Sequence, residues 1–302
     1  MLADLDAQLS RYESGVYSLI GYGRQSLSPA AAVQYTTDAK LKSQLQLIPA
    51  GTTYWVGFNI KAGPFNGVAG GRPPRDFFSA AIDRNALAAA VCNHGTACAP
   101  ATGGLISKGL LGYMGDNADT NTKFDPAAAK AEYLAWDPKK TRLKNLSYVY
   151  DTDPFNKAVC ANLVAQWQKN LGVLVKCVER DRKTFFDARN GKCGYTLFRQ
   201  SWRADYDHPQ DWYDYLFLTG ASSGGSCYHN PSFDTSVKTA DGKALNTAMQ
   251  DYQAAAELLI HDTVFAALVY GVQQYLVHPY VKGASGNALY DNYWSTAKIV
   301  SH

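Results

Sequence analysis

The chain has 302 residues, of which 46% are hydrophobic and 18% are charged. This length allows two domains, or one domain with extra lobes, and it is sufficient for a large hydrophobic core. The 29 basic and 26 acidic residues give a net charge of +3 without a long basic stripe, which argues against nucleic-acid binding. The 20 tyrosines, 12 phenylalanines and 6 tryptophans exclude a disordered chain.

The N-terminal segment predicts an amphipathic helix, because Leu2, Leu5, Leu9 and Tyr12 recur at helical spacing. It lacks the basic region and long apolar core of a signal peptide, so we expect a chain that begins within a fold. A strand over 16–20, a helix that begins at Pro29 and strands over 45–48 and 52–60 follow. Residues 64–74 are rich in glycine and proline and predict a loop.

The middle of the chain predicts an α/β fold. Two helical stretches, 75–91 with a break at Asp83 and another that begins at Pro126, precede a regular alternation of strands and helices. The alternating elements are the strand 146–150, the helix 153–170, the strand 173–178, the helix 181–190 and the strand 195–200. Such alternation is typical of βαβ units, so we expect a mixed, largely parallel sheet flanked by helices. The remainder predicts helices over 209–218, 231–239 and 243–261, then strands over 265–270, 272–277 and 293–300.

Six cysteines form three neighbour pairs along the sequence. Their even number and short separations predict disulfides and an oxidising compartment. Cys92, His94 and Cys98 could supply three soft zinc ligands, but structural zinc needs four, so a small disulfide loop is favoured there. We expect neither a metal nor another cofactor. The predicted disulfides are Cys92–Cys98, Cys160–Cys177 and Cys193–Cys227.

The segment 199–212 is the richest in chemistry, with two arginines, two tryptophans, a tyrosine and several carboxylates after a predicted strand. Ligand sites in parallel α/β sheets lie beyond the carboxyl ends of strands. Paired carboxylates beside aromatic rings suit a glycosidase, a cation-binding site or a solvated acidic loop. Gly220-Ala-Ser222-Ser-Gly224 also matches the G-x-S-x-G nucleophile elbow of hydrolases, and Asp234 and His261 lie downstream of it as possible partners. A flexible loop is favoured, because the elbow must be followed by a helix and the glycine-rich continuation cannot form one.

Ordered motifs along nearly the whole chain resemble those of the extracytoplasmic oligopeptide-binding proteins of ABC importers, solute-binding family 5. The segments Trp202-Arg-Ala-Asp205-Tyr206-Asp-His-Pro and Asn230-Pro-Ser-Phe-Asp234 resemble the family pattern W-x-A-D-Y-x-x-P…N-P-x-F-D. Ala81-Ile-Asp-Arg-Asn-Ala-Leu87 and Phe124-Asp-Pro are similar to two further family motifs. The resemblance implies a periplasmic-binding-protein-like lobe plus partial segments of a second, discontinuous lobe.

The resemblance also implies a division of the chain and a set of ligand contacts. Residues 1–55 would end the first lobe, 56–268 would form the complete second lobe, and 269–302 would return to the first, so only the carboxyl-terminal part of a longer protein is expected. Asp205 would bind the α-ammonium of a peptide and Arg199 its carboxylate. Aromatic contacts would come from Tyr54, Trp55, Trp202 and Tyr206. Gly57 departs from the family, because some members have an acid there.

These observations predict a solute-binding protein without catalytic activity. It would capture a peptide or similar small solute between two lobes, deliver it to the permease of an ABC transporter, and act as a monomer at the periplasmic or extracellular face of the membrane. A chain with only part of the first lobe should bind its ligand weakly. The alternative is a hydrolase that uses Ser222 or the carboxylates of Asp205 and Asp207.

Overall fold

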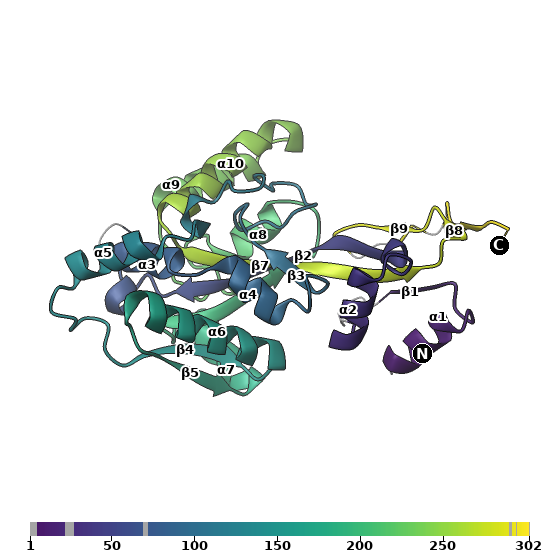
Figure 1. The fold of residues 1–302 in the computed structure, drawn as a ribbon. Coiled ribbons are helices and arrows are strands. Elements are labelled where there is room, and N and C mark those ends of the chain that lie inside the picture. The colour runs from purple at the N-terminus through teal and green to yellow at the C-terminus, as the bar shows by residue number, and fades with distance from the viewer. Residues whose placement is uncertain (1–4, 22–26, 69–71, 290–291, 294, 302) are drawn as a thin grey trace.

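The protein is described from a computed structural model that covers residues 5–21, 27–68, 72–289, 292–293 and 295–301 (Figure 1). A large body carries most of the helices, and a narrow arm at the other end of the molecule carries both chain termini. None of the helices among these residues is long and apolar enough to cross a membrane.

The central sheet has the strand order β1-β7-β2-β6-β4-β5, and β3 also pairs with β7. The sheet is mixed, as expected, but the expected largely parallel arrangement is wrong. Only β6, β4 and β5 are parallel neighbours, whereas the remaining pairs are antiparallel. The alternation of strands and helices covers only the middle of the chain, and β2 and β7 enter the sheet from outside it. The strands of this sheet are β1 Leu19–Gly21, β2 Leu45–Phe58, β3 Cys98–Pro100, β4 Leu146–Asp151, β5 Val175–Arg180, β6 Leu197–Arg203 and β7 Phe265–Val277.

Helices cover the sheet of the body, and their starts follow the capping signals of the sequence. Asp83, Asp125 and Asp153 each accept backbone N–H groups of the helix that follows, and Gly172 ends α6 in the left-handed conformation that glycine adopts readily. The helices of the body are α3 Arg72–Ala80, α4 Arg84–Val91, α5 Pro126–Trp136, α6 Pro154–Leu171, α7 Arg182–Arg189, α8 Gln210–Leu216, α9 Pro231–Asp241 and α10 Leu245–His261. The expected loop over 64–74 is too long, because α3 begins at Arg72 with two prolines in its first turn, where proline is tolerated.

The two faces of β4 pack against different helices. Tyr148 belongs to the main core together with Trp167 of α6, whereas Val149 packs with Phe185 of α7. Successive strand residues point to opposite faces, so this alternation places α6 and α7 on the two sides of the sheet. Both helices begin near the carboxyl ends of the strands that precede them.

The arm is built on the outer ends of β2 and β7. The helices α1 Leu5–Glu13 and α2 Pro29–Thr37 pack there around a small separate core that includes Tyr12, Tyr35 and Leu276. Leu2 lies outside the described residues. The predicted strands 265–270 and 272–277 are one continuous strand, β7, and the predicted strand 293–300 is wrong, because only two short pairings lie there. The short strands of the arm are β8 Val281–Lys282, β9 Ser285–Gly286, β10 Asn292–Tyr293 and β11 Lys298–Ile299.

All six cysteines are joined in the structure, and the partners are the predicted ones: Cys92 with Cys98, Cys160 with Cys177, and Cys193 with Cys227. The first disulfide connects the end of α4 to β3, and the second connects α6 to β5. The third connects two loops, one before β6 and one before α9. The cysteines of the zinc alternative are therefore already bonded to each other.

Candidate ligand-binding site

A hollow of about 640 Å³ lies at the carboxyl ends of β4 and β6. Side chains from β2 and β6 form its floor, and the first turns of α6 and α7 border it. Because β4 and β6 are parallel, the segments that follow them leave the sheet at the same edge. The lining residues are Thr52, Tyr54, Ala97, Cys98, Asp151, Asp153, Phe155, Asn156, Arg182, Phe186, Arg199, Ser201, Arg203, Asp205, Gly271 and Val272.

A buried ion pair lies at one side of the hollow. Nε and Nη2 of Arg199 contact Oδ1 of Asp151, and its Nη1 donates to the Ser201 hydroxyl at 2.9 Å. Asp151 is 2% exposed and Arg199 8% exposed. Asn156 in the first turn of α6 donates to Oδ1 of Asp151 at 3.0 Å. All three nitrogens of Arg199 therefore already donate to groups of the protein.

A second buried arginine, at the carboxyl end of α7, lies near this pair. Arg189 is 4% exposed, and both Arg189 and Arg199 lie over the rings of Phe185 and Phe186. Burial, together with repulsion from Arg199, lowers the pKa of Arg189 to about 9. Asp151 is thus the counter-charge of a buried cluster that contains two cations.

Asp205 follows β6 in a loop whose backbone is held from both sides. The N–H of Ala204 donates to the carbonyl of Gly51 at 2.7 Å, and the N–H of Asp205 donates to Oδ2 of Asp211 at 3.1 Å. The side chain of Asp205 is exposed at the rim of the hollow, and its carboxylate makes no hydrogen bond or ion pair with any residue in the described part of the chain. An anchored backbone with an unengaged carboxylate suits a cationic ligand group.

Asp211 positions this loop. Its Oδ2 also accepts the indole N–H of Trp202 at 3.0 Å, and the residue has no exposed surface. The other oxygen, Oδ1, is buried without a hydrogen-bond partner among the described residues. Burial raises the pKa of the Asp211 carboxyl. The sequence contained this residue within its richest segment, but only the structure shows that it acts on the backbone of Asp205.

The structure brings together three of the six ligand contacts expected from the sequence, namely Tyr54, Arg199 and Asp205. The other three do not line the hollow. Trp55 is 2% exposed in the main core, because adjacent strand residues point to opposite faces and Tyr54 takes the open face. Trp202 lies on the opposite face from Ser201 and stacks on Tyr215, with 5.9 Å between ring centroids.

Tyr206 is exposed beyond the hollow, where its ring lies 6.4 Å from that of His208. The lining residues that the sequence reasoning missed include Asp151, Asp153, Phe155 and Arg182. A signal for the first two was present, because Asp151-Thr-Asp153 stands directly after a predicted strand, as the selected segment 199–212 does.

The hydrolase alternative lacks its geometry. Ser222 lies in an exposed loop without the strand-to-helix turn that the elbow needs. His261 contacts Asp262 at 2.9 Å, and Asp234 accepts the N–H of Thr219 at 3.0 Å, so neither is placed with Ser222. Asp207 accepts the N–H of Leu111 at 2.7 Å and fixes a loop instead of pairing with Asp205.

The fold is that of an α/β protein with a hollow at the carboxyl ends of its parallel strands. Residues 3–224 match the family described as bacterial extracellular solute-binding proteins, family 5 Middle, and the chain belongs to this family. The chain is 28% identical over 275 residues to the periplasmic oligopeptide-binding protein OppA of Escherichia coli (strain K12), covering 87% of this chain and 48% of OppA. It is 27% identical over 272 residues to the periplasmic murein peptide-binding protein MppA of the same strain, again covering 87% of this chain and 48% of the relative.

Solved structures share this fold. The unliganded open form of MppA, a periplasmic murein tripeptide binding protein, has a TM-score of 0.86 at 24% identity, covering 100% of this chain and 56% of that chain. Haemophilus influenzae OppA in complex with RPPGFSPFR has a TM-score of 0.71 at 23% identity, covering 98% of this chain and 56% of that chain. The chain spans about half the length of the curated relatives that it matches.

Proposed function

We propose that this chain forms one wall of the ligand site of an extracytoplasmic solute-binding protein that captures a peptide or similar small solute. The observation that carries the proposal is the exposed Asp205 carboxylate, held by its backbone at the rim of the hollow and unengaged among the described residues. A peptide α-ammonium supplies the complementary charge. Its three N–H donors suit a carboxylate that has both oxygens available.

The hollow also contains the surfaces that a peptide backbone and side chains need. Tyr54 and Phe155 form an aromatic pair, with 5.0 Å between ring centroids, and can pack against an apolar side chain. The sequence-based role of Arg199 as the carboxylate partner does not suit its three engaged nitrogens. We assign that role to Arg182 at the start of α7, whose side chain is 79% exposed and whose guanidinium lies 3.9 Å from Asp151.

The arrangement of the chain suits capture between two lobes. We assign residues 56–268 to one lobe, and 1–55 with 269–302 to the partial second one. The small core of the arm, which draws on both of these terminal stretches, supports the division. The peptide-binding names of the relatives support capture of a peptide. Delivery of the solute to an ABC permease, by a monomer that is not an enzyme, is part of the same proposal. Three disulfides favour the periplasmic or extracellular face of the membrane.

Titration of the chain with trialanine and with N-acetyl-trialanine, followed by NMR, tests the role of Asp205. Because the Asp205 carboxylate is exposed and screened by water, N-acetylation should weaken binding by about three- to tenfold. Asp205→Asn should weaken trialanine binding by the same factor, and it should add almost nothing to the effect of N-acetylation, because both changes delete one interaction.

Glu257→Gln on α10 is the matched control, since it removes an exposed carboxylate that does not line the hollow. It should leave both affinities unchanged. If Asp205→Asn and N-acetylation each weaken binding and the two fold-losses of affinity multiply, Asp205 does not bind the amine. Mass spectrometry of the recovered trialanine addresses catalysis, and cleaved peptide would refute a pure binding role.

A further inference from the structure

A second cavity of about 510 Å³ lies at the opposite end of the body from the peptide hollow. It begins at Ile60, just beyond the end of β2, whereas the hollow contains Thr52 and Tyr54 of the same strand. The pairing of Thr52 with Arg203 and of Phe58 with Leu197 places the two sites beyond opposite ends of the β2–β6 ladder. Six residues of extended strand separate these ends by about 20 Å.

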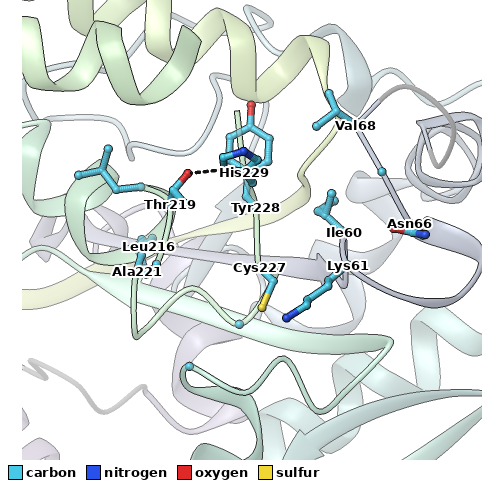
Figure 2. A pocket seen from close by; sticks show the side chains of 15 residues that line it. Ile60, Lys61, Asn66, Val68, Leu216, Thr219, Ala221, Cys227, Tyr228 and His229 are labelled. Carbon is cyan, nitrogen blue, oxygen red and sulfur yellow. Dashed lines mark hydrogen bonds between the residues drawn. The ribbon is translucent and has the colours of Figure 1, made fainter. Parts of the chain in front are cut away.

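The walls of this cavity are mostly apolar. Ile60 and Val68 form one side, and Leu216 and Ala221 form the other, with Tyr228 between them (Figure 2). Ile60 and Leu216 are already buried, at 5% and 2% exposure, so the walls are preformed by the core and not by mobile side chains. A volume of this size and an apolar lining with few polar groups are typical of small-molecule sites.

The polar groups of the cavity are cationic or neutral, and none of the residues that line it in the described part of the chain carries a carboxylate. Lys61 extends toward Cys227 below Ile60 in Figure 2, and its ammonium makes no hydrogen bond or ion pair with a described residue. His229 faces the same space and contacts the Thr219 hydroxyl at 2.9 Å.

Carboxylates do lie behind the wall, but protein donors occupy them. Asp234 accepts the N–H of Thr219 at 3.0 Å, and Asp262 accepts the hydroxyl of Tyr228 at 2.5 Å. The peptide hollow differs in this respect, because Asp151, Asp153 and Asp205 line it together with its arginines. The two cavities therefore differ in the charges of the side chains that line them.

We propose that the cavity around Ile60, Lys61 and Leu216 is a second ligand site, and that it takes a small amphipathic carboxylate. The apolar tail of the ligand fills the space between Val68 and Ala221, and its carboxylate lies beside the ammonium of Lys61 at the rim. Burial of the tail supplies most of the binding energy, and the exposed charge pair supplies the preference for an anion.

Octanoate and its uncharged analogue octanamide are the probes that test this site. Octanoate should shift the NMR signals of the Ile60, Val68 and Ala221 methyl groups and leave those of the peptide hollow unchanged. Lys61→Met keeps the apolar stem and removes the charge, so it should weaken octanoate binding by about three- to tenfold without changing octanamide binding. Lys144→Met is the matched control, because Lys144 is an exposed loop lysine outside both cavities, and it should change neither affinity.

Ala221→Phe places a ring in the cavity and should abolish the binding of both probes while the fold is retained. Equal binding of octanoate and octanamide to the wild type would refute the carboxylate assignment. Shifts at Tyr54 instead of Ile60 would refute the location. Asp205→Asn should have no effect on octanoate, so failure of the proposed peptide site and failure of this site are separate outcomes.

Discussion

Replacing Asp151 by asparagine should destabilise the protein strongly, because it removes the counter-charge of a buried arginine cluster. The Asp151 side chain is 2% exposed, and it contacts Arg199 through two nitrogens. With the charge gone, Arg199 and Arg189 remain buried around the same two phenylalanine rings without an anion. Loss of one partner of a buried pair costs about 3–5 kcal/mol, and asparagine keeps one acceptor oxygen, so we expect about 3 kcal/mol.

A double-mutant cycle isolates the pair itself. Arg199→Met leaves Asp151 with Asn156 and with the more distant Arg182, and should also cost about 3 kcal/mol. The double variant should lose roughly 3 rather than 6 kcal/mol, since the second change removes a group that the first has already left unpaired. Urea unfolding followed by tryptophan fluorescence gives the free energies of unfolding.

The exposed i,i+4 pair of Lys183 and Asp187 on α7 supplies the matched control. The two side chains are 85% and 56% exposed, so Asp187→Asn should leave the urea midpoint almost unchanged. Strictly additive losses for Asp151→Asn and Arg199→Met would refute the reasoning, because they would mean that the two charges do not stabilise each other. A loss for Asp151→Asn no larger than that for Asp187→Asn would refute it equally.

Three further predictions concern other parts of the structure. Burial raises the pKa of Asp119 to about 6, so stability should rise as the pH falls from 6 toward 4. The effect of Asp119→Asn on the midpoint of thermal unfolding should therefore be more favourable at pH 7.5 than at pH 4.5, although the change also removes an anion near the buried Arg84 at pH 7.5. An equal effect at both pH values would contradict this prediction. Gly57→Ala should cost about 1–3 kcal/mol, because a Cβ there would meet the ring of Phe198. Gly242→Ala should be tolerated, because a Cβ there would make only ordinary van der Waals contacts, and urea unfolding will show the difference between the two variants. Peptide mapping of unreduced protein from an oxidising compartment should recover the three disulfides, and removal of any one should cost about 2–4 kcal/mol; six free thiols would refute the pairing.

The sequence was informative where the relevant partners are local. Asp153 and Pro154 predict the start of α6, and the neighbour spacing of the cysteines predicts bonds that the structure contains. The position of Asp205 after a predicted strand was enough to place it at the edge of the sheet where the hollow lies, because the carboxyl ends of parallel strands share one edge. These features depend on a few residues of chain or on a general property of sheets.

Long-range pairing could not be predicted in the same way. Arg199 was expected to meet a ligand, but its partner Asp151 is 48 residues away and reaches it only because β4 and β6 are parallel neighbours. Whether Tyr54 or Trp55 faces the hollow depends on the register of β2, and the sequence of the strand is apolar on both faces. The antiparallel pairing of β2 with β7 joins segments more than 200 residues apart, which local periodicity does not record.

The strands that connect body and arm restrict how these two parts can move. β2 and β7 pass from one part to the other as neighbours. Their ladder shifts register between Tyr54 and Trp55 within the body, and its wider irregular step, between Pro49 and Thr53, lies toward the arm. The arm therefore cannot slide away from the body, because sliding would break the paired hydrogen bonds along both strands. Bending at this irregular step leaves the ladder on either side intact. The connection between arm and body should therefore bend easily at this step but resist sliding along the strands. A force applied to the arm should then rotate the body about this step.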